Sequence, residues 1–200
     1  MDAGPGLTFF SARQERLLFQ IVGAVSIPQI VEEEILGKAS RDTRFQPAAS
    51  VLGKLPDKLL HVLPDTQTEE LGEVIYRIRG KGIELHHLPK KDLGETMVIA
   101  HAVVRAEAGT DVIILIDEAA GTRIAHRESA RLERMRSANG GCGTLRLLST
   151  MDILTVGAHR GLIADRGHMR RLYEQFRTLD DGLVHIDNTR LLSRELWGFA

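Results

Sequence analysis

Acidic residues recur in this chain at places where strands are predicted to end or helices to begin. They are Asp2, Glu32, Glu33, Glu34, Glu95, Asp117 and Glu118. Carboxylates that lie close together raise each other's pKa unless a cation neutralises them. Hard oxygen ligands at that density suit Mg²⁺ or Mn²⁺, and such an ion activates water and stabilises charge on a phosphoryl oxygen. The pattern therefore indicates metal-assisted attack on a phosphate ester.

Each acid also has a purely structural interpretation. Asp92 and Glu95 have the spacing of a capping box. The acids at 32–34 favour the positive end of a helix dipole, and Asp117 could cap the next helix. The metal hypothesis depends on their meeting at one rim of a parallel sheet, because ligands bind beyond the carboxyl ends of such strands.

The elements that must position these acids alternate between helix and strand. The predicted helices cover 7–22, 29–38, 93–107, 119–138, 150–160, 166–178 and 188–197, and the predicted strands cover 24–27, 112–116 and 145–148. The aliphatic run 112–116 is typical of a central parallel strand, and the nearly apolar segment 93–107 of a buried helix. We therefore predict an α/β fold with a parallel sheet covered on both faces.

Length and composition fit one such domain with a small C-terminal appendage. The 200 residues are 43% hydrophobic but only 4% aromatic, which favours helices packed on a sheet over a β-sandwich. Residues 39–89, interrupted by Pro56, Pro64 and two glycines, predict an insertion or lid with helical stretches at 47–54 and 67–79.

The net charge and the cysteine content limit which partners and which cellular compartment the sequence indicates. The formal net charge of −1 indicates no nucleic-acid partner by itself, so such a partner must be argued from local clusters. Cys142 is the only cysteine, which agrees with a reducing cytosol. The sequence has neither a leader pattern nor an apolar run of about 18 residues, so we expect a cytoplasmic protein without membrane insertion.

Four segments of the chain resemble the motifs of PIN-domain nucleases, in particular the subgroup with an extended C-terminus often found as toxin components of toxin–antitoxin pairs. The segments are Asp2-Ala3-Gly4-Pro5, the stretch 27–35, Asp92-Leu93-Gly94-Glu95 followed by Ile99-Ala100-His101-Ala102, and Leu115-Ile116-Asp117-Glu118 followed by Arg123-Ile124-Ala125. Residues 150–163 resemble the subgroup's helix after its last strand. The resemblance implies a three-layer α/β/α fold with a central, mainly parallel sheet, a nuclease domain at 1–163 and a helical extension at 164–200.

The same resemblance implies an endoribonuclease that uses Mg²⁺ or Mn²⁺ and is bound by an antitoxin. Its catalytic and metal-binding residues would be Asp2, Glu34, Glu95 and Asp117, with Glu118 as a further ligand. Three departures matter. Only Met1 precedes Asp2 where the family has its first strand, so either the true start lies upstream or that strand is lacking. Met97 stands where many relatives have a further acid, and Ser149 replaces a usual glycine.

Basic and apolar side chains suggest partner surfaces. Arg123, Arg127 and Arg131 recur every four residues and share a helix face, which is either a solvated face or a contact for RNA phosphates. A second basic group at 159–171 could also contact phosphates, or an acidic partner. Apolar residues at 191–199 either complete the core or form a homodimer or antitoxin groove. His86 and His87 would point to opposite faces of a strand, which disfavours a shared metal ion.

Two other function classes remain in competition. One is a catalytically silent PIN-like module that binds RNA or a partner protein. The other is a phosphate-handling enzyme of the phosphatase or receiver type, which would require a lysine downstream of its aspartate. No lysine follows Lys91, which counts against that second class.

Overall fold

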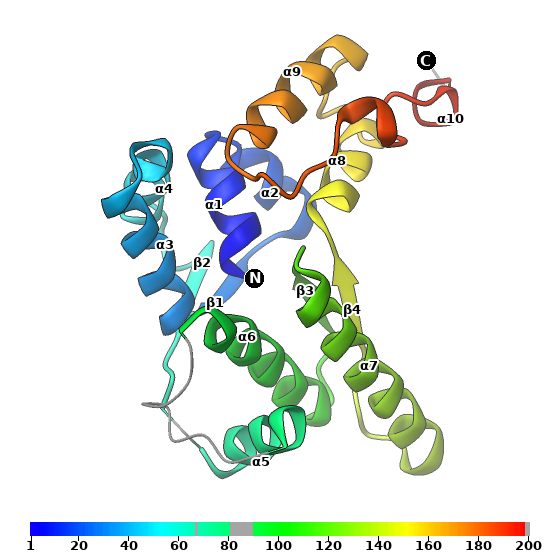
Figure 1. Cartoon of the computed structure of the whole chain (residues 1–200). Coiled ribbons are helices and arrows are strands. Elements are labelled where there is room, and N and C mark those ends of the chain that lie inside the picture. The colour runs from blue at the N-terminus through cyan, green and yellow to red at the C-terminus, as the bar shows by residue number, and fades with distance from the viewer. Residues whose placement is uncertain (67, 81–89, 199–200) are drawn as a thin grey trace. The chain divides into compact units, whose positions relative to one another are not determined.

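The computed structural model describes residues 1–66, 68–80 and 90–198 and is a mixed α/β structure dominated by helices (Figure 1). The helices are α1 (Ala3–Ser11), α2 (Glu15–Val22), α3 (Gln29–Arg41), α4 (Gln46–Leu52), α5 (Glu69–Arg79), α6 (Lys90–Glu107), α7 (Ala119–Asn139), α8 (Thr150–His159), α9 (Arg166–Arg177) and α10 (Arg194–Trp197). The strands are β1 (Val25–Pro28), β2 (Leu60–Leu63), β3 (Val112–Leu115) and β4 (Leu145–Leu148), and two 3₁₀ turns cover Thr43–Phe45 and Ile186–Asn188.

The chain divides into two compact units that are interleaved in sequence. Unit 1 contains Met1–Ala3, Ser26–Glu34 and Val62–Leu148, and unit 2 contains Gly4–Val25, Ile35–His61 and Ser149–Ala200. These units neither coincide with nor exclude the predicted nuclease domain at 1–163 and extension at 164–200, which stay predictions. Within the described ranges, no helix is long and apolar enough to cross a membrane.

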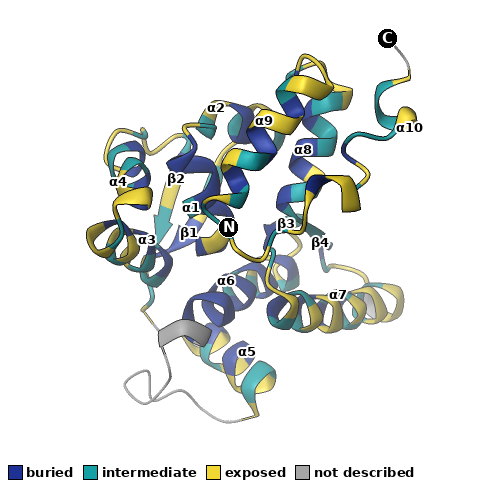
Figure 2. Ribbon diagram, turned by 45° about the horizontal axis from the view of Figure 1, so that its top comes forward, coloured by how far each residue is buried: buried dark blue, intermediate teal, exposed yellow. Residues whose placement is uncertain are grey.

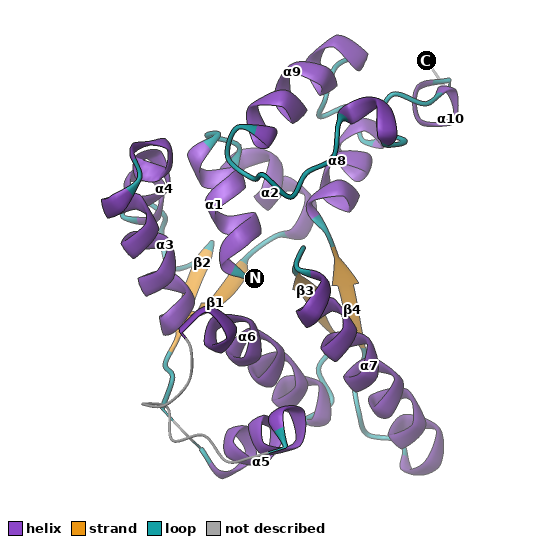
Figure 3. Ribbon diagram, in the orientation of Figure 1, coloured by secondary structure: helices purple, strands orange, loops and turns teal. Residues whose placement is uncertain are grey.

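Parallel strand pairing is confirmed in unit 1. β3 pairs with β4 in parallel, with Val112 opposite Leu145 and Leu115 opposite Leu148 (Figure 3). The aliphatic run at 112–116 predicted β3. The prediction that both faces of the sheet are covered is not met by this pair, because Ile113 is 53% exposed and Arg146 is also exposed. β1 pairs with β2 in a second two-stranded sheet. β2 was not predicted, since four residues close to Pro64 carry too little periodicity to identify a strand.

The first two residues connect β1 to the end of β3. The Met1 nitrogen donates a hydrogen bond to the Ser26 carbonyl oxygen at 2.8 Å. The Asp2 amide donates to the Leu115 carbonyl oxygen at 3.0 Å. The backbone of Asp2 is therefore held beside Leu115, the last residue of β3, and Asp117 follows Leu115 by two residues.

The centre of unit 1 is α6, as its apolar sequence predicted. Met97, Ile99 and Ala100 are fully buried, and Figure 2 colours most of the helix as buried. α5, α7 and β3 pack against it. α7 instead is exposed along one face (Figure 2), as its many charged residues require.

In unit 2, two helices differ in extent from their predictions. The single helix predicted over 7–22 is divided into α1 and α2 at Arg13, whose φ of 57° lies in the left-handed region. Each half is apolar enough to continue the pattern, so periodicity did not locate the break. The terminal helix predicted over 188–197 is reduced to α10, because Ser193 caps its start by accepting from the Leu196 amide.

Aromatic side chains fill the core of unit 2. Phe9 and Phe176 meet edge to face, with ring centroids 5.0 Å apart and planes at 76°. The Tyr173 hydroxyl donates to the Val184 carbonyl oxygen at 2.9 Å, so its buried ring keeps a polar partner. These contacts join α1 and α9 to the segment that follows α9.

Candidate metal centre

All the predicted acidic site residues belong to unit 1. Asp2 is 8% exposed and Glu95 is 9% exposed, which is unusual for carboxylates. Glu34 and Asp117 are half-buried, whereas Glu118 is exposed. Four different elements contribute them: the first residues of the chain, α3, α6 and the segment between β3 and α7.

Asp2 lies in the electrostatic field of two other predicted ligands. Burial raises the pKa of its carboxyl group, and the nearby charges of Glu118 and Asp117 raise this pKa further. The hydrogen bond between the Asp2 amide and Leu115 explains this proximity, because it holds the aspartate at the end of β3. The end of β3 thus brings Asp2 into the neighbourhood of Asp117 and Glu118.

Glu34 reaches α6 beside Glu95. Its Oε2 lies 2.9 Å from the position that a Cβ on Gly94 would occupy. Gly94 therefore leaves the space into which the Glu34 carboxylate fits. This contact joins the first half of α3 to the residue that precedes Glu95 on α6.

Glu95 in turn reaches the first turn of α7. A Cβ added at Gly121 would collide with the Glu95 carboxylate and with its side-chain carbons. Gly121 is buried and follows Glu118 by three residues, so the Glu95 side chain ends close to the acidic segment after β3. Two glycines inside helices thus create the space through which acids from α3 and α6 approach α7.

These contacts place the acids along α6, at the start of α7 and at the end of β3, and they do not form a closed cage. Within the parts of the chain that are described, no three His, Cys, Asp or Glu side chains are close enough to be assigned as a metal-binding group. The donors nevertheless fit a hard divalent cation in chemical type, because all are carboxylates and two are buried. A cation would relieve the repulsion that contributes to the raised pKa of Asp2.

The three predicted RNA-binding arginines differ in their surroundings. Arg123 and Arg127 are exposed on α7. Arg131 is half-buried and forms ion pairs with Glu107 and, at 2.9 Å, with Glu128. Two of the three guanidinium groups are therefore directed to solvent, while the third ties α7 to α6.

Sequence reasoning missed the residues that make room for the acids and that hold their helices. Gly94 and Gly121 carry a signal that could have found them, since a glycine inside a helix costs about 1 kcal/mol against alanine and usually has a packing reason. Asp65, whose carboxylate accepts a hydrogen bond from the Ile30 amide at the start of α3, has no such signal, because a single aspartate after a proline is typical of any loop. His86 and His87 lie outside the described residues, as does the Asp92 side chain of the predicted capping box.

Comparison of the chain with protein-family models, with curated proteins and with solved structures gave no match. The assignment of a role therefore rests on the positions of these residues. The geometry brings together acids that are up to 116 positions apart along the chain, from Asp2 to Glu118.

Proposed function

We propose that this protein is a metal-dependent endoribonuclease that holds Mg²⁺ or Mn²⁺ with Asp2, Glu34, Glu95 and Asp117. The observation that supports it most is the row of contacts from Glu34 to Gly94, from Glu95 to Gly121, and from Asp2 to the end of β3. Carboxylates that approach one another repel, and a bound cation is one way in which a folded protein relieves that repulsion.

The residues divide the work by their burial and charge. Asp2 and Glu95, being buried, hold fixed positions, while the exposed Glu118 can turn toward the site. A bound ion supplies Lewis acidity toward water and toward the phosphoryl group. Arg123 and Arg127 contact phosphates of the RNA strand, because guanidinium groups donate bidentate hydrogen bonds to phosphate oxygens.

The proposal includes the finer fold, a PIN-like three-layer α/β/α arrangement with a central, mainly parallel sheet. It is supported by the parallel β3–β4 pair and by the backbone hydrogen bonds through which Met1 and Asp2 link β1 to β3. The further proposals of a cytoplasmic toxin, a cognate antitoxin and a homodimer rest on the resemblance of the motifs alone.

A second candidate function is a catalytically silent PIN-like module that binds RNA or a partner protein. One observation favours it. Met97, which stands where many PIN-domain nucleases have a further acid, is fully buried in α6. A methionine in that place contributes packing and no hard ligand, which would weaken binding of a cation.

Cleavage of single-stranded RNA in the presence of Mn²⁺ separates the two candidates. Asp117→Asn removes a charged ligand with little change in shape, so we expect it to lower the cleavage rate by about 100-fold or more. EDTA should abolish cleavage by the wild-type protein. Cleavage that survives both treatments would exclude the metal mechanism, and RNA binding without cleavage would favour the silent module.

A matched pair of glycine substitutions tests the geometry without changing any charge. Gly121→Ala places a methyl group where the Glu95 carboxylate lies and should lower Mn²⁺ affinity about 10-fold or more. Gly72→Ala, inside α5 of the same unit, meets nothing within 4 Å and should leave Mn²⁺ affinity unchanged. Equal affinities in the two variants would show that Glu95 does not need its place beside Gly121.

A further inference from the structure

Asp65 holds the start of α3 from a distant part of the chain. Its Oδ2 accepts a hydrogen bond from the Ile30 amide at 2.6 Å. Ile30 is the second residue of α3, where backbone amides have no partner within the helix. A carboxylate at this end is also favoured by the helix dipole. Asp65 therefore caps α3 although it lies 35 residues further along the sequence.

The other oxygen of Asp65 faces α6. Its Oδ1 lies 4.0 Å from Nε2 of His101, and neither buried atom has a hydrogen-bond partner among the described residues. The distance is too long for a hydrogen bond but allows an ion pair once the imidazole is protonated. Burial and the nearby Glu33 raise the pKa of Asp65, while burial lowers the pKa of His101. A cationic imidazole would therefore relieve a carboxylate that is otherwise poorly solvated.

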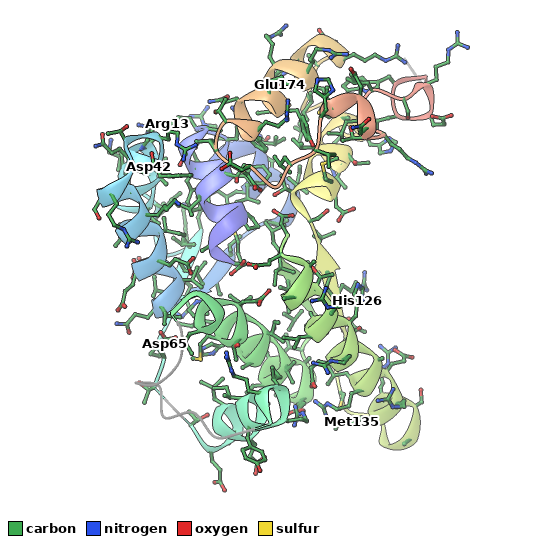
Figure 4. The ribbon with its side chains drawn as sticks, viewed as in Figure 1. Arg13, Asp42, Asp65, His126, Met135 and Glu174 are labelled. Atoms are coloured by element: carbon green, nitrogen blue, oxygen red, sulfur yellow. The ribbon has the colours of Figure 1, made fainter. Side chains whose placement is uncertain are left out.

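α3 and α6 are thus connected at two points, which lie about one helical turn apart on α3 and about two turns apart on α6. One is the path from Ile30 through Asp65 to His101, and the other is the contact of Glu34 with Gly94. Glu34 follows Ile30 by four residues, and His101 follows Glu95 by six. Figure 4 labels Asp65, which lies beside the first turn of α3.

We propose that Asp65 is a positioning residue that, together with His101, fixes the first turn of α3 against α6. It thereby sets the separation between the carboxylates of Glu34 and Glu95. The inference rests on the proposed function, because this separation matters for activity only if both carboxylates hold the same cation.

The test compares the wild-type protein with Asp65→Ala and Asp65→Asn, and measures Mn²⁺ affinity by titration calorimetry. Asp65→Ala should weaken Mn²⁺ binding about 10-fold or more, as loss of an outer-shell partner commonly does. Asp65→Asn should lose less, because an amide oxygen can still accept from Ile30. If the alanine variant does not fold, Asp65→Asn, which keeps the side-chain shape, takes its place. A loss of Mn²⁺ affinity greater than that of the control variant below supports the positioning role, and an affinity equal to that of the control overturns it.

Asp111→Asn is the matched control. The Asp111 Oδ1 accepts from the Thr144 amide at 2.8 Å in the same unit, yet it binds the loop before β4 rather than α3. This variant should keep its Mn²⁺ affinity within about twofold. An equal loss in Asp65→Ala and Asp111→Asn would overturn the positioning role.

A second measurement does not depend on metal binding. Asp65→Asn should lower the pKa of His101 in an NMR titration, because removal of a nearby anion disfavours the imidazolium. Asp65→Ala should also speed hydrogen exchange at the Ile30 amide. If wild type binds no Mn²⁺, the proposed function fails, but these two results still decide whether Asp65 connects α3 to α6. An unchanged pKa of His101 together with an unchanged exchange rate at Ile30 would overturn that connection.

Discussion

The two units differ in what fills their cores. Unit 2 contains eight of the nine aromatic residues, and the fully buried Phe9, Tyr173 and Phe176 are among them. Unit 1 has only Tyr76, which is 59% exposed, and its core is aliphatic. Aromatic rings supply large buried areas, while β-branched and small residues allow the close packing of helices on strands.

They also differ in charge. Unit 1 has 12 basic and 17 acidic residues, a difference of −5, whereas unit 2 has 14 basic and 10 acidic residues, a difference of +4. The balanced total conceals this contrast. Unit 1 gathers the carboxylates and bears their mutual repulsion, so its stability should respond to pH and to divalent cations more than that of unit 2.

Removal of one aromatic ring should have the largest effect on stability. Phe176→Ala deletes a fully buried ring that packs against Phe9, so we expect unfolding free energy to fall by about 3–5 kcal/mol. Urea denaturation gives the change. Tyr76→Ala, at the exposed aromatic of unit 1, should cost less than about 0.5 kcal/mol. Similar losses in the two variants would remove the contrast between the cores.

A smaller effect is expected from the ion pairs of unit 1. Glu128 is 7% exposed and pairs with Arg131 at 2.9 Å and with Arg77 at 3.3 Å. Glu128→Gln should cost about 1–2 kcal/mol, because both arginines keep Glu107 as a partner. Glu133→Gln, at an exposed pair with Arg136, should cost less than about 0.5 kcal/mol. Thermal unfolding of both variants checks the difference.

The smallest effect is a pH dependence with a defined sign. The folded-state pKa of Asp2 is raised above 3.8 by burial, with Glu118 and Asp117 adding to the shift, so ionised Asp2 destabilises the folded protein above that folded-state pKa. Asp2→Asn should therefore raise the melting temperature at pH 7, and the gain should disappear as pH falls below 3.8.

Asp111→Asn should behave in the opposite way. Hydrogen bonds from the Thr144 side chain and amide lower the pKa of Asp111, so its ionised form stabilises the folded protein above pH 3.8. Its replacement should lower the melting temperature at pH 7, and this loss should fade as pH falls through the lowered folded-state pKa. Parallel pH profiles for Asp2→Asn and Asp111→Asn would contradict the electrostatic account of the site.

Elements that have a local sequence pattern could be predicted from the sequence. The aliphatic runs before Asp117 and before Ser149 identified β3 and β4, and the apolar segment after Asp92 identified α6. The turn at Arg13 was not predictable, since a left-handed arginine has no composition signal and the surrounding apolar pattern continues through it.

The same distinction between local and long-range information applies to the candidate site. That Asp117 follows a strand and that Glu95 lies in the first half of a buried helix could be inferred from neighbouring residues. That Glu34 lies against Gly94, and that Asp65 reaches Ile30, depends on how distant segments pack. Such contacts join residues 35 or more positions apart, and a single sequence contains no periodicity that reports them.

The interleaving of the two units has a consequence for synthesis. A chain growing from its N-terminus passes from one unit to the other five times, and β3 acquires its partner strand only when Leu148 has left the ribosome. Until then the backbone N–H and C=O groups of this aliphatic strand are open to pairing with other chains. Nascent protein is therefore vulnerable to misassembly during the interval in which residues 116–148 are leaving the ribosome.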